Sequence, residues 1–213
     1  MRKKLDSSQT LKEELYNVLT HGIGILFSIV GFWYLQNHRA GVYPLEKYAI
    51  WIYSSSMFLL FTASTLYHYI KKPELKRIFR ILDHISIYFL IAGTYTPIVL
   101  TVLLSSKGQF LFVLVWVIAG LGTLLKIFFT GRFEKLSLLL YLLMGWLIMI
   151  DIQALIERLS FNQLLFIALG GFFYTSGILF YVKEKWRYNH VIWHIFVLLG
   201  CFSHYLTILS VLK

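Results

Sequence analysis

The sequence predicts an all-α integral membrane protein, folded as a bundle of seven transmembrane helices. Two observations support this prediction. Of the 213 residues, 58% are hydrophobic and only 14% are charged, and the mean hydropathy of +0.71 is far above that of a soluble domain of this length. Apolar stretches of about 20 residues, each long enough to cross a bilayer core of ~30 Å as a helix, recur along the chain with short connections between them.

The candidate spans follow one another closely and leave no room for a soluble domain. They cover approximately residues 17–36, 48–70, 81–104, 109–130, 136–152, 161–182 and 190–211. The fifth span is short and ends near Asp151. Residues 1–16 form a short basic N-terminal segment, and residues 17–213 form the transmembrane domain. The first span follows a basic start, as a signal peptide would, but it is long, aromatic and without a small-residue cleavage signal, so we expect it to be retained.

The charge distribution predicts how the bundle is oriented. A formal net charge of +10 would suit a nucleic-acid-binding protein, but a basic soluble domain would not carry this much apolar sequence, so we expect no nucleic-acid partner. Basic residues next to spans mark the cytoplasmic side. Most Lys and Arg residues fall in the N-terminal segment and in the second, fourth and sixth connections. The pattern therefore predicts a cytoplasmic N-terminus and an outside C-terminus.

Ionisable residues in or beside the spans are the best sequence clue to function, because such residues are costly in a membrane. His68 ends the second span, Asp83 opens the third, and His190 and His194 open the seventh. With the predicted topology, all four lie at the cytoplasmic end. Cys201 is the only cysteine, which excludes an internal disulfide and a Cys-rich zinc module. A metal site would therefore consist of histidines and carboxylates.

The spacing of these residues suits a zinc site. His190 and His194 are one turn apart on the same helix face and are separated by ~6 Å along the axis, so they can bind one ion together with His68. Three imidazoles leave a fourth position open on tetrahedral zinc, which is the arrangement of catalytic sites. Asp83 is the candidate to accept a proton or a hydrogen bond from water there, and Ser64, one turn from His68, is a candidate donor.

Simpler interpretations exist for each of these residues. Two histidines at helical spacing also suit hydrogen bonding at the membrane interface, and Asp83 suits an N-cap. His204 lies roughly 15 Å further along the seventh span than His194, which is too far to bind the same ion. It faces broadly the same side, so it could line a polar path through the bundle, but we expect an interhelical hydrogen bond. His21 lies at a depth that suits support of the site, and His84 points about 100 degrees away from Asp83. We place both outside the ligand set.

Several motifs at these positions resemble a known family. They run from about residue 13 to 209 and comprise Glu13-Glu14-x-x-Asn17-x-x-Thr20-His21-Gly22-x-Gly24, Ser64-x-x-x-His68, Leu82-Asp83-His84, Ala92-Gly93-Thr94-Tyr95-Thr96-Pro97, and His190-x-x-Trp193-His194 with Gly200 and His204. Together they resemble the hemolysin III family, the bacterial branch of the progestin and adipoQ receptor (PAQR) superfamily. That superfamily includes the adiponectin receptors and is related to the alkaline ceramidases.

The resemblance implies a seven-helix protein of the bacterial plasma membrane with Zn²⁺ held by His68, His190 and His194, and with Asp83 and Ser64 in the remaining polar positions. It leaves three functional classes open. The first is a zinc-dependent hydrolase of lipid amide or ester bonds, ceramidase-like and active in membrane homeostasis, with membrane lipids as substrate. The second is a pore-forming cytolysin with structural zinc. The third is a receptor-like protein, for which the sequence offers no ligand-reading domain.

Overall fold

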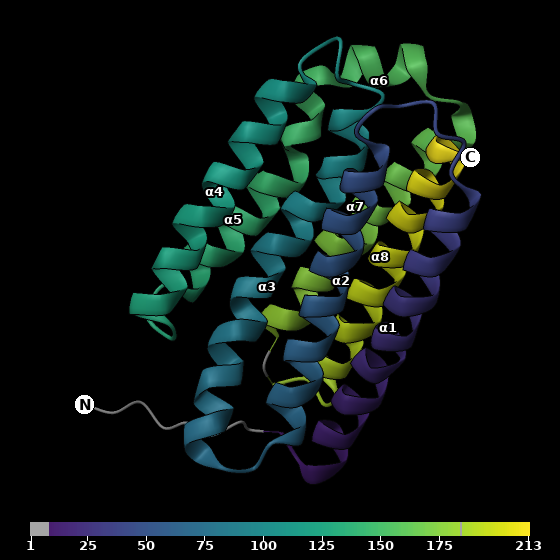
Figure 1. Ribbon diagram of the computed structural model, residues 1–213. Coiled ribbons are helices and arrows are strands. Elements are labelled where there is room, and N and C mark those ends of the chain that lie inside the picture. Colours follow the sequence, from purple (N-terminus) through teal and green to yellow (C-terminus); the bar gives the residue numbers. More distant parts are fainter. Residues whose placement is uncertain (1–8, 184) are drawn as a thin grey trace.

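A computed structural model describes residues 9–183 and 185–213, and this part of the chain is entirely helical (Figure 1). Within it, seven helical segments are long and apolar enough to cross a membrane. The elements are α1 (Leu11–His38), α2 (Glu46–Tyr69), α3 (Pro73–Leu100), α4 (Gly108–Phe129), α5 (Glu134–Trp146), the 3-10 helix η1 (Leu147–Asp151), α6 (Ile152–Arg158), α7 (Phe161–Val182) and α8 (Asn189–Leu212). The predicted fold class is confirmed.

The helices form a bundle in which α3 and α8 each contact several others. α3 packs against α2 and α4, and α8 packs against α7 and α1, while α4 and α5 lie beside α3 on the side away from α1 (Figure 1). The start of α1, the α2–α3 and α4–α5 connections and the start of α8 lie toward the same end. The basic connections therefore share one end of the bundle. That this end is cytoplasmic stays a prediction, and Arg2, Lys3 and Lys4 of the N-terminal segment lie outside the described residues.

Two helices begin earlier than their apolar spans. α1 starts at Leu11 rather than residue 17, because Thr10 and Glu13 form a reciprocal capping box. α3 starts at Pro73 rather than residue 81, because Pro73 occupies the first helical turn and the charged segment after it continues the helix. Asp83 therefore lies inside α3, and the interpretation of Asp83 as an N-cap is wrong. Hydropathy marks the part of a helix that meets lipid, whereas capping marks where the helix begins.

The fifth span is not one regular helix. α5 ends at Trp146 and continues as η1 and α6, beyond the predicted end at residue 152. The Tyr95 hydroxyl donates to the Gly145 carbonyl (2.9 Å) and accepts from the Ile148 backbone N–H (2.8 Å), so α3 satisfies backbone groups that the break releases. Asp151 accepts from the Ser106 hydroxyl (2.9 Å) and from the Lys107 backbone N–H (3.0 Å). These bonds tie η1 to the α3–α4 connection.

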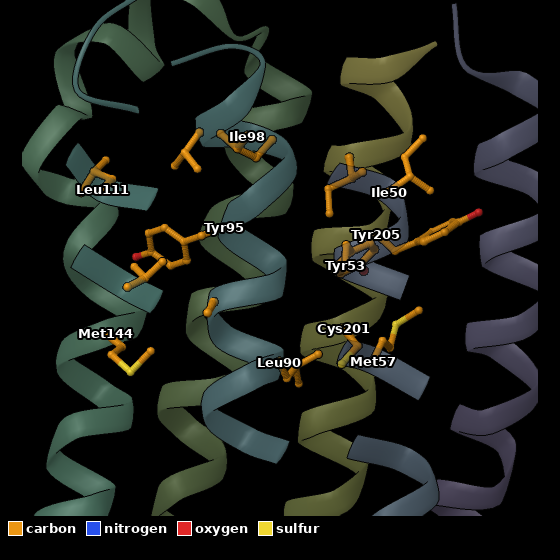
Figure 2. Close-up of a cluster of buried hydrophobic side chains, with 14 of the residues drawn as sticks. Ile50, Tyr53, Met57, Leu90, Tyr95, Ile98, Leu111, Met144, Cys201 and Tyr205 are labelled. Atoms are coloured by element: carbon orange, nitrogen blue, oxygen red, sulfur yellow. The ribbon is translucent and has the colours of Figure 1, made fainter. Parts of the chain in front are cut away.

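The buried core runs mainly along α2, α3 and α8. Figure 2 shows Tyr53 and Met57 of α2 beside Cys201 and Tyr205 of α8, while Tyr95 lies on the other side of the core, toward α4 and α5. Outward-facing Leu, Ile and Phe side chains, by contrast, are widely exposed on α4, α5 and α7. An apolar exterior around a packed interior is what a bilayer requires, because lipid covers the outer face.

Close contact between α2 and α3 depends on Gly93. A Cβ at this position would overlap the side chain of Ser56, which is itself fixed by a hydrogen bond from its hydroxyl to the Tyr53 carbonyl (2.7 Å). We expect Gly93→Ala to lower the free energy of unfolding by about 1–3 kcal/mol, because the overlap forces the two helices apart. Thermal unfolding in detergent would measure this loss.

Gly171→Ala is the matched control for that experiment. A Cβ at Gly171 meets nothing within 4 Å, so the substitution is expected to be neutral or to stabilise α7 by up to about 1 kcal/mol through helix propensity. Equal effects of the two substitutions would contradict the close α2–α3 contact. Gly122 and Gly170 likewise pack inside the bundle, against Tyr88 and His204.

Candidate metal centre

Three histidines from two helices meet at the end of the bundle that carries the basic connections. His68 is in the last turn of α2, and His190 and His194 are in the first two turns of α8. One ring nitrogen from each lies within 4.8 Å of those of the other two. The ring centroids are 5.0 Å apart for His68 and His190, 5.0 Å for His68 and His194, and 4.6 Å for His190 and His194. These side chains can hold a metal ion.

The hydrogen bonding of the cluster fits a metal site. The Nε2 atoms of His68 and His190 are buried and have no hydrogen-bond partner among the described residues. A buried polar atom without a partner costs about 1–3 kcal/mol, and two such atoms in one cluster of three histidines suit a shared ligand. Imidazole nitrogen is a preferred ligand of zinc and of several other divalent transition metals. The donor set therefore fits the expected ion, although it does not by itself select zinc.

Polar side chains of α1 contact two of the three rings. The Nδ1 atom of His68 lies 2.6 Å from a carboxylate oxygen of Glu14 and 3.4 Å from Nδ2 of Asn17. The Nδ1 atom of His194 lies 3.3 Å from the hydroxyl of Thr20. The sequence interpretation gave these three α1 residues no role. Their spacing could have revealed it, since residues 14, 17 and 20 or 21 lie on one face of a helix.

His21 lies next to the cluster, as its depth predicted. Its ring stacks on that of His194, with centroids 3.6 Å apart and planes inclined by 11°, and its edge meets Phe61 of α2. Neither ring nitrogen has a hydrogen-bond partner among the described residues. His21 is not one of the three converging residues, so it supports the ring of His194 by packing.

Asp83 and Ser64 also lie close to the histidines. Both are buried, and Asp83 of α3 lies near His68 and Ser64 of α2. The Ser64 hydroxyl faces the Asp83 carboxylate and forms no hydrogen bond with the described residues. Asp83 is outside the converging set of nitrogens. Asp83 thus lies beside the three histidines without joining them, and its role as a catalytic residue stays a prediction.

His84 and His204 lie away from the three-histidine cluster. His84 faces a separate ionic cluster in which the Glu134 carboxylate lies 3.7 Å from His84 Nδ1 and accepts a hydrogen bond of 2.7 Å from Lys126, a lysine that is only 2% exposed. His204 stacks on Tyr174 of α7, with centroids 5.5 Å apart. With the residues that the structure describes, His204 makes this ring contact but no hydrogen bond. The prediction of an interhelical hydrogen bond is therefore wrong.

The fold and the cluster together define a multi-pass membrane protein with a three-histidine site near one end of a seven-helix bundle. Comparison with known proteins assigns the chain to a family. The model of the Haemolysin-III related family matches residues 9–205, which is almost the whole chain. The chain therefore belongs to this family.

Individual relatives agree with this assignment. The chain is 43% identical over 194 residues to Hemolysin-3 of Bacillus cereus, an alignment that covers 91% of this chain and 89% of the relative. It is 42% identical over 201 residues to a Hemolysin-3 homolog of Bacillus subtilis (strain 168), with 94% of each chain covered. A more distant relative is the human monocyte to macrophage differentiation factor, 29% identical over 205 residues, with 93% of this chain and 84% of the relative covered.

Proposed function

We propose that the protein is a zinc-dependent hydrolase of lipid amide or ester bonds that acts in the bacterial plasma membrane. The observation that carries this proposal is the convergence of His68, His190 and His194, with a buried carboxylate beside them, inside a membrane bundle. A closed structural zinc site is usually completed by four protein ligands, whereas three leave a position for water or substrate. A buried site among spans suits a substrate that reaches it from the lipid phase.

Zinc in such a site would supply a Lewis acid that polarises a scissile carbonyl and activates water. The protein's own residues would do the rest. Asp83 would accept the proton of the attacking water as general base and pass it to the leaving amine or alcohol. Ser64, whose hydroxyl is unpartnered among the described side chains, would donate a hydrogen bond to the developing oxyanion. Membrane lipids would be the substrates, and membrane homeostasis the physiological setting.

Fatty acid release from a lipid panel tests this function. The purified protein, first stripped of metal and then reloaded with one equivalent of Zn²⁺, would be mixed with ceramides, other N-acyl lipids and ester phospholipids. Release of fatty acid should require zinc and should be restored by reloading. If the zinc-loaded protein releases no fatty acid from any member of the panel, the hydrolase proposal fails.

A pore-forming cytolysin is the second candidate, because two relatives carry the name Hemolysin-3. In that case zinc would join α2 to α8 as a structural link, and the protein would permeabilise a membrane without turnover. Leakage of dye from protein-free liposomes on addition of the protein measures this activity directly. Leakage that persists without lipid cleavage would favour the cytolysin, and cleavage without leakage would favour the hydrolase.

A further inference from the structure

We propose that α1 is part of the metal centre, with Glu14 and Thr20 as positioning residues that hold His68 and His194 in the tautomer that presents Nε2 to the ion. The proposal rests on the metal site proposed above, but it does not depend on the hydrolase activity. It assigns a role to a helix that supplies no ligand. It also explains why polar side chains line one face of an otherwise apolar span.

The contact between Glu14 and His68 fixes one ring. The carboxylate can only accept a hydrogen bond, so the 2.6 Å contact identifies His68 Nδ1 as the protonated nitrogen. The lone pair of the imidazole then lies on Nε2, the atom that is buried without a partner. The second oxygen of Glu14 accepts from Lys76 of α3 at 2.8 Å. This ion pair holds the carboxylate in place and offsets its charge, so Glu14 is fixed on both sides.

The contact between Thr20 and His194 fixes the second ring in the same way. The Thr20 hydroxyl has one hydrogen, and that hydrogen is directed to backbone carbonyls of its own helix, at 2.9 Å from Tyr16 O and 3.0 Å from Asn17 O. The hydroxyl oxygen is therefore left to accept from His194 Nδ1, 3.3 Å away. His194 then also carries its free lone pair on Nε2. Two ligands from two different helices are thus oriented by one face of α1.

Residues that hydrogen-bond to a metal-binding histidine affect metal binding strongly. A carboxylate that accepts from the distal nitrogen of a ligand histidine fixes the orientation of the ring and raises its basicity, and its loss typically weakens metal binding by about 10- to 100-fold. The contact of Glu14 with His68 supplies the carboxylate and the histidine of such an arrangement. Glu13, the neighbour of Glu14, accepts instead from the backbone N–H of Tyr188 at 2.9 Å, just before α8 begins. The first turn of α1 is thus attached to α2, α3 and the start of α8.

Competition with a chromogenic chelator would measure the effect. We expect Glu14→Gln to weaken Zn²⁺ binding by about 10- to 100-fold and to shift the visible absorption of the Co²⁺-loaded protein, because the ring of His68 loses its charged partner. Glu74→Gln is the matched control. Glu74 is an exposed carboxylate in the first turn of α3, so its loss changes the net charge equally without touching a ligand.

A second pair of variants keeps the test valid if Glu14→Gln fails to fold. Thr20→Val removes the hydroxyl at nearly constant volume and should weaken zinc binding, whereas Thr20→Ser retains the hydroxyl and should bind zinc as the wild type does. Zinc binding by Glu14→Gln and Thr20→Val equal to that of the wild type would overturn the proposal. A wild-type protein that binds zinc but cleaves no lipid would contradict only the hydrolase function.

Discussion

Replacing His194 with alanine should abolish stoichiometric zinc binding. The substitution removes one of three converging nitrogens, and the remaining pair cannot surround an ion that prefers four ligands. In the wild type, free zinc at about 1,000 times its dissociation constant should stabilise the folded state by about 4.1 kcal/mol, which appears as a rise in the unfolding temperature. His194→Ala should show no such zinc-dependent rise. Metal analysis and thermal unfolding with and without zinc would measure both effects.

His204→Ala is the control on the same helix. His204 packs on Tyr174 and Gly170 away from the cluster. This variant should therefore lose some stability, but zinc should raise its unfolding temperature as much as it does in the wild type. The unfolding temperatures with and without zinc are compared for the same variant, so the loss of packing between His194 and His21 affects both values equally. A zinc-dependent rise of wild-type size in His194→Ala would show that the ion binds elsewhere.

Asp83→Asn should remove hydrolysis and leave zinc in place. Asparagine has nearly the same shape but cannot accept a proton, and loss of a general base typically lowers the rate by about 100- to 10,000-fold. Asp83 is outside the group of converging nitrogens, so the zinc content should not change. Fatty acid release and metal content, measured on the same preparation, would separate the two properties.

Asp151→Asn is the matched control, because Asp151 is the other aspartate that is buried within residues 9–183 and 185–213 but lies at the opposite end of the bundle. It accepts hydrogen bonds from the α3–α4 connection, so its substitution should lower stability while turnover per folded molecule stays the same. Wild-type turnover in Asp83→Asn would exclude Asp83 as the base. Loss of zinc in that variant would instead make Asp83 part of the ligand set.

The sequence predicts the architecture well because lipid imposes a simple rule on it. Every span must be long, apolar and helical, and all seven predicted spans correspond to helical segments. The ends of the helices are predicted less well. The starts of α1 and α3 and the break after Trp146 depend on capping by Thr10, on Pro73 and on hydrogen bonds from Tyr95, and apolar length carries no information about these.

The candidate site, like the fold, is predicted only in part from the sequence. The convergence of His68, His190 and His194 could be predicted, because charge topology brings them to one end and helical spacing aligns two of them. The contribution of α1 could not be predicted from membrane depth alone, because α1 supplies polar groups without supplying a ligand. The contacts of Glu14 and Thr20 depend on α1 lying against both α2 and α8, and this neighbour relation comes from tertiary packing.

The origin of the ligands has a consequence for biogenesis. His68 comes from the second span, whereas His190 and His194 come from α8, which follows the six other spans in chain order. The three-histidine set therefore does not exist until the seventh span has been made and has packed beside α1 and α2. An ion held by all three histidines would therefore be loaded late in assembly, because a chain that stops before α8 presents only His68 of the three, and a single histidine has little affinity for an ion.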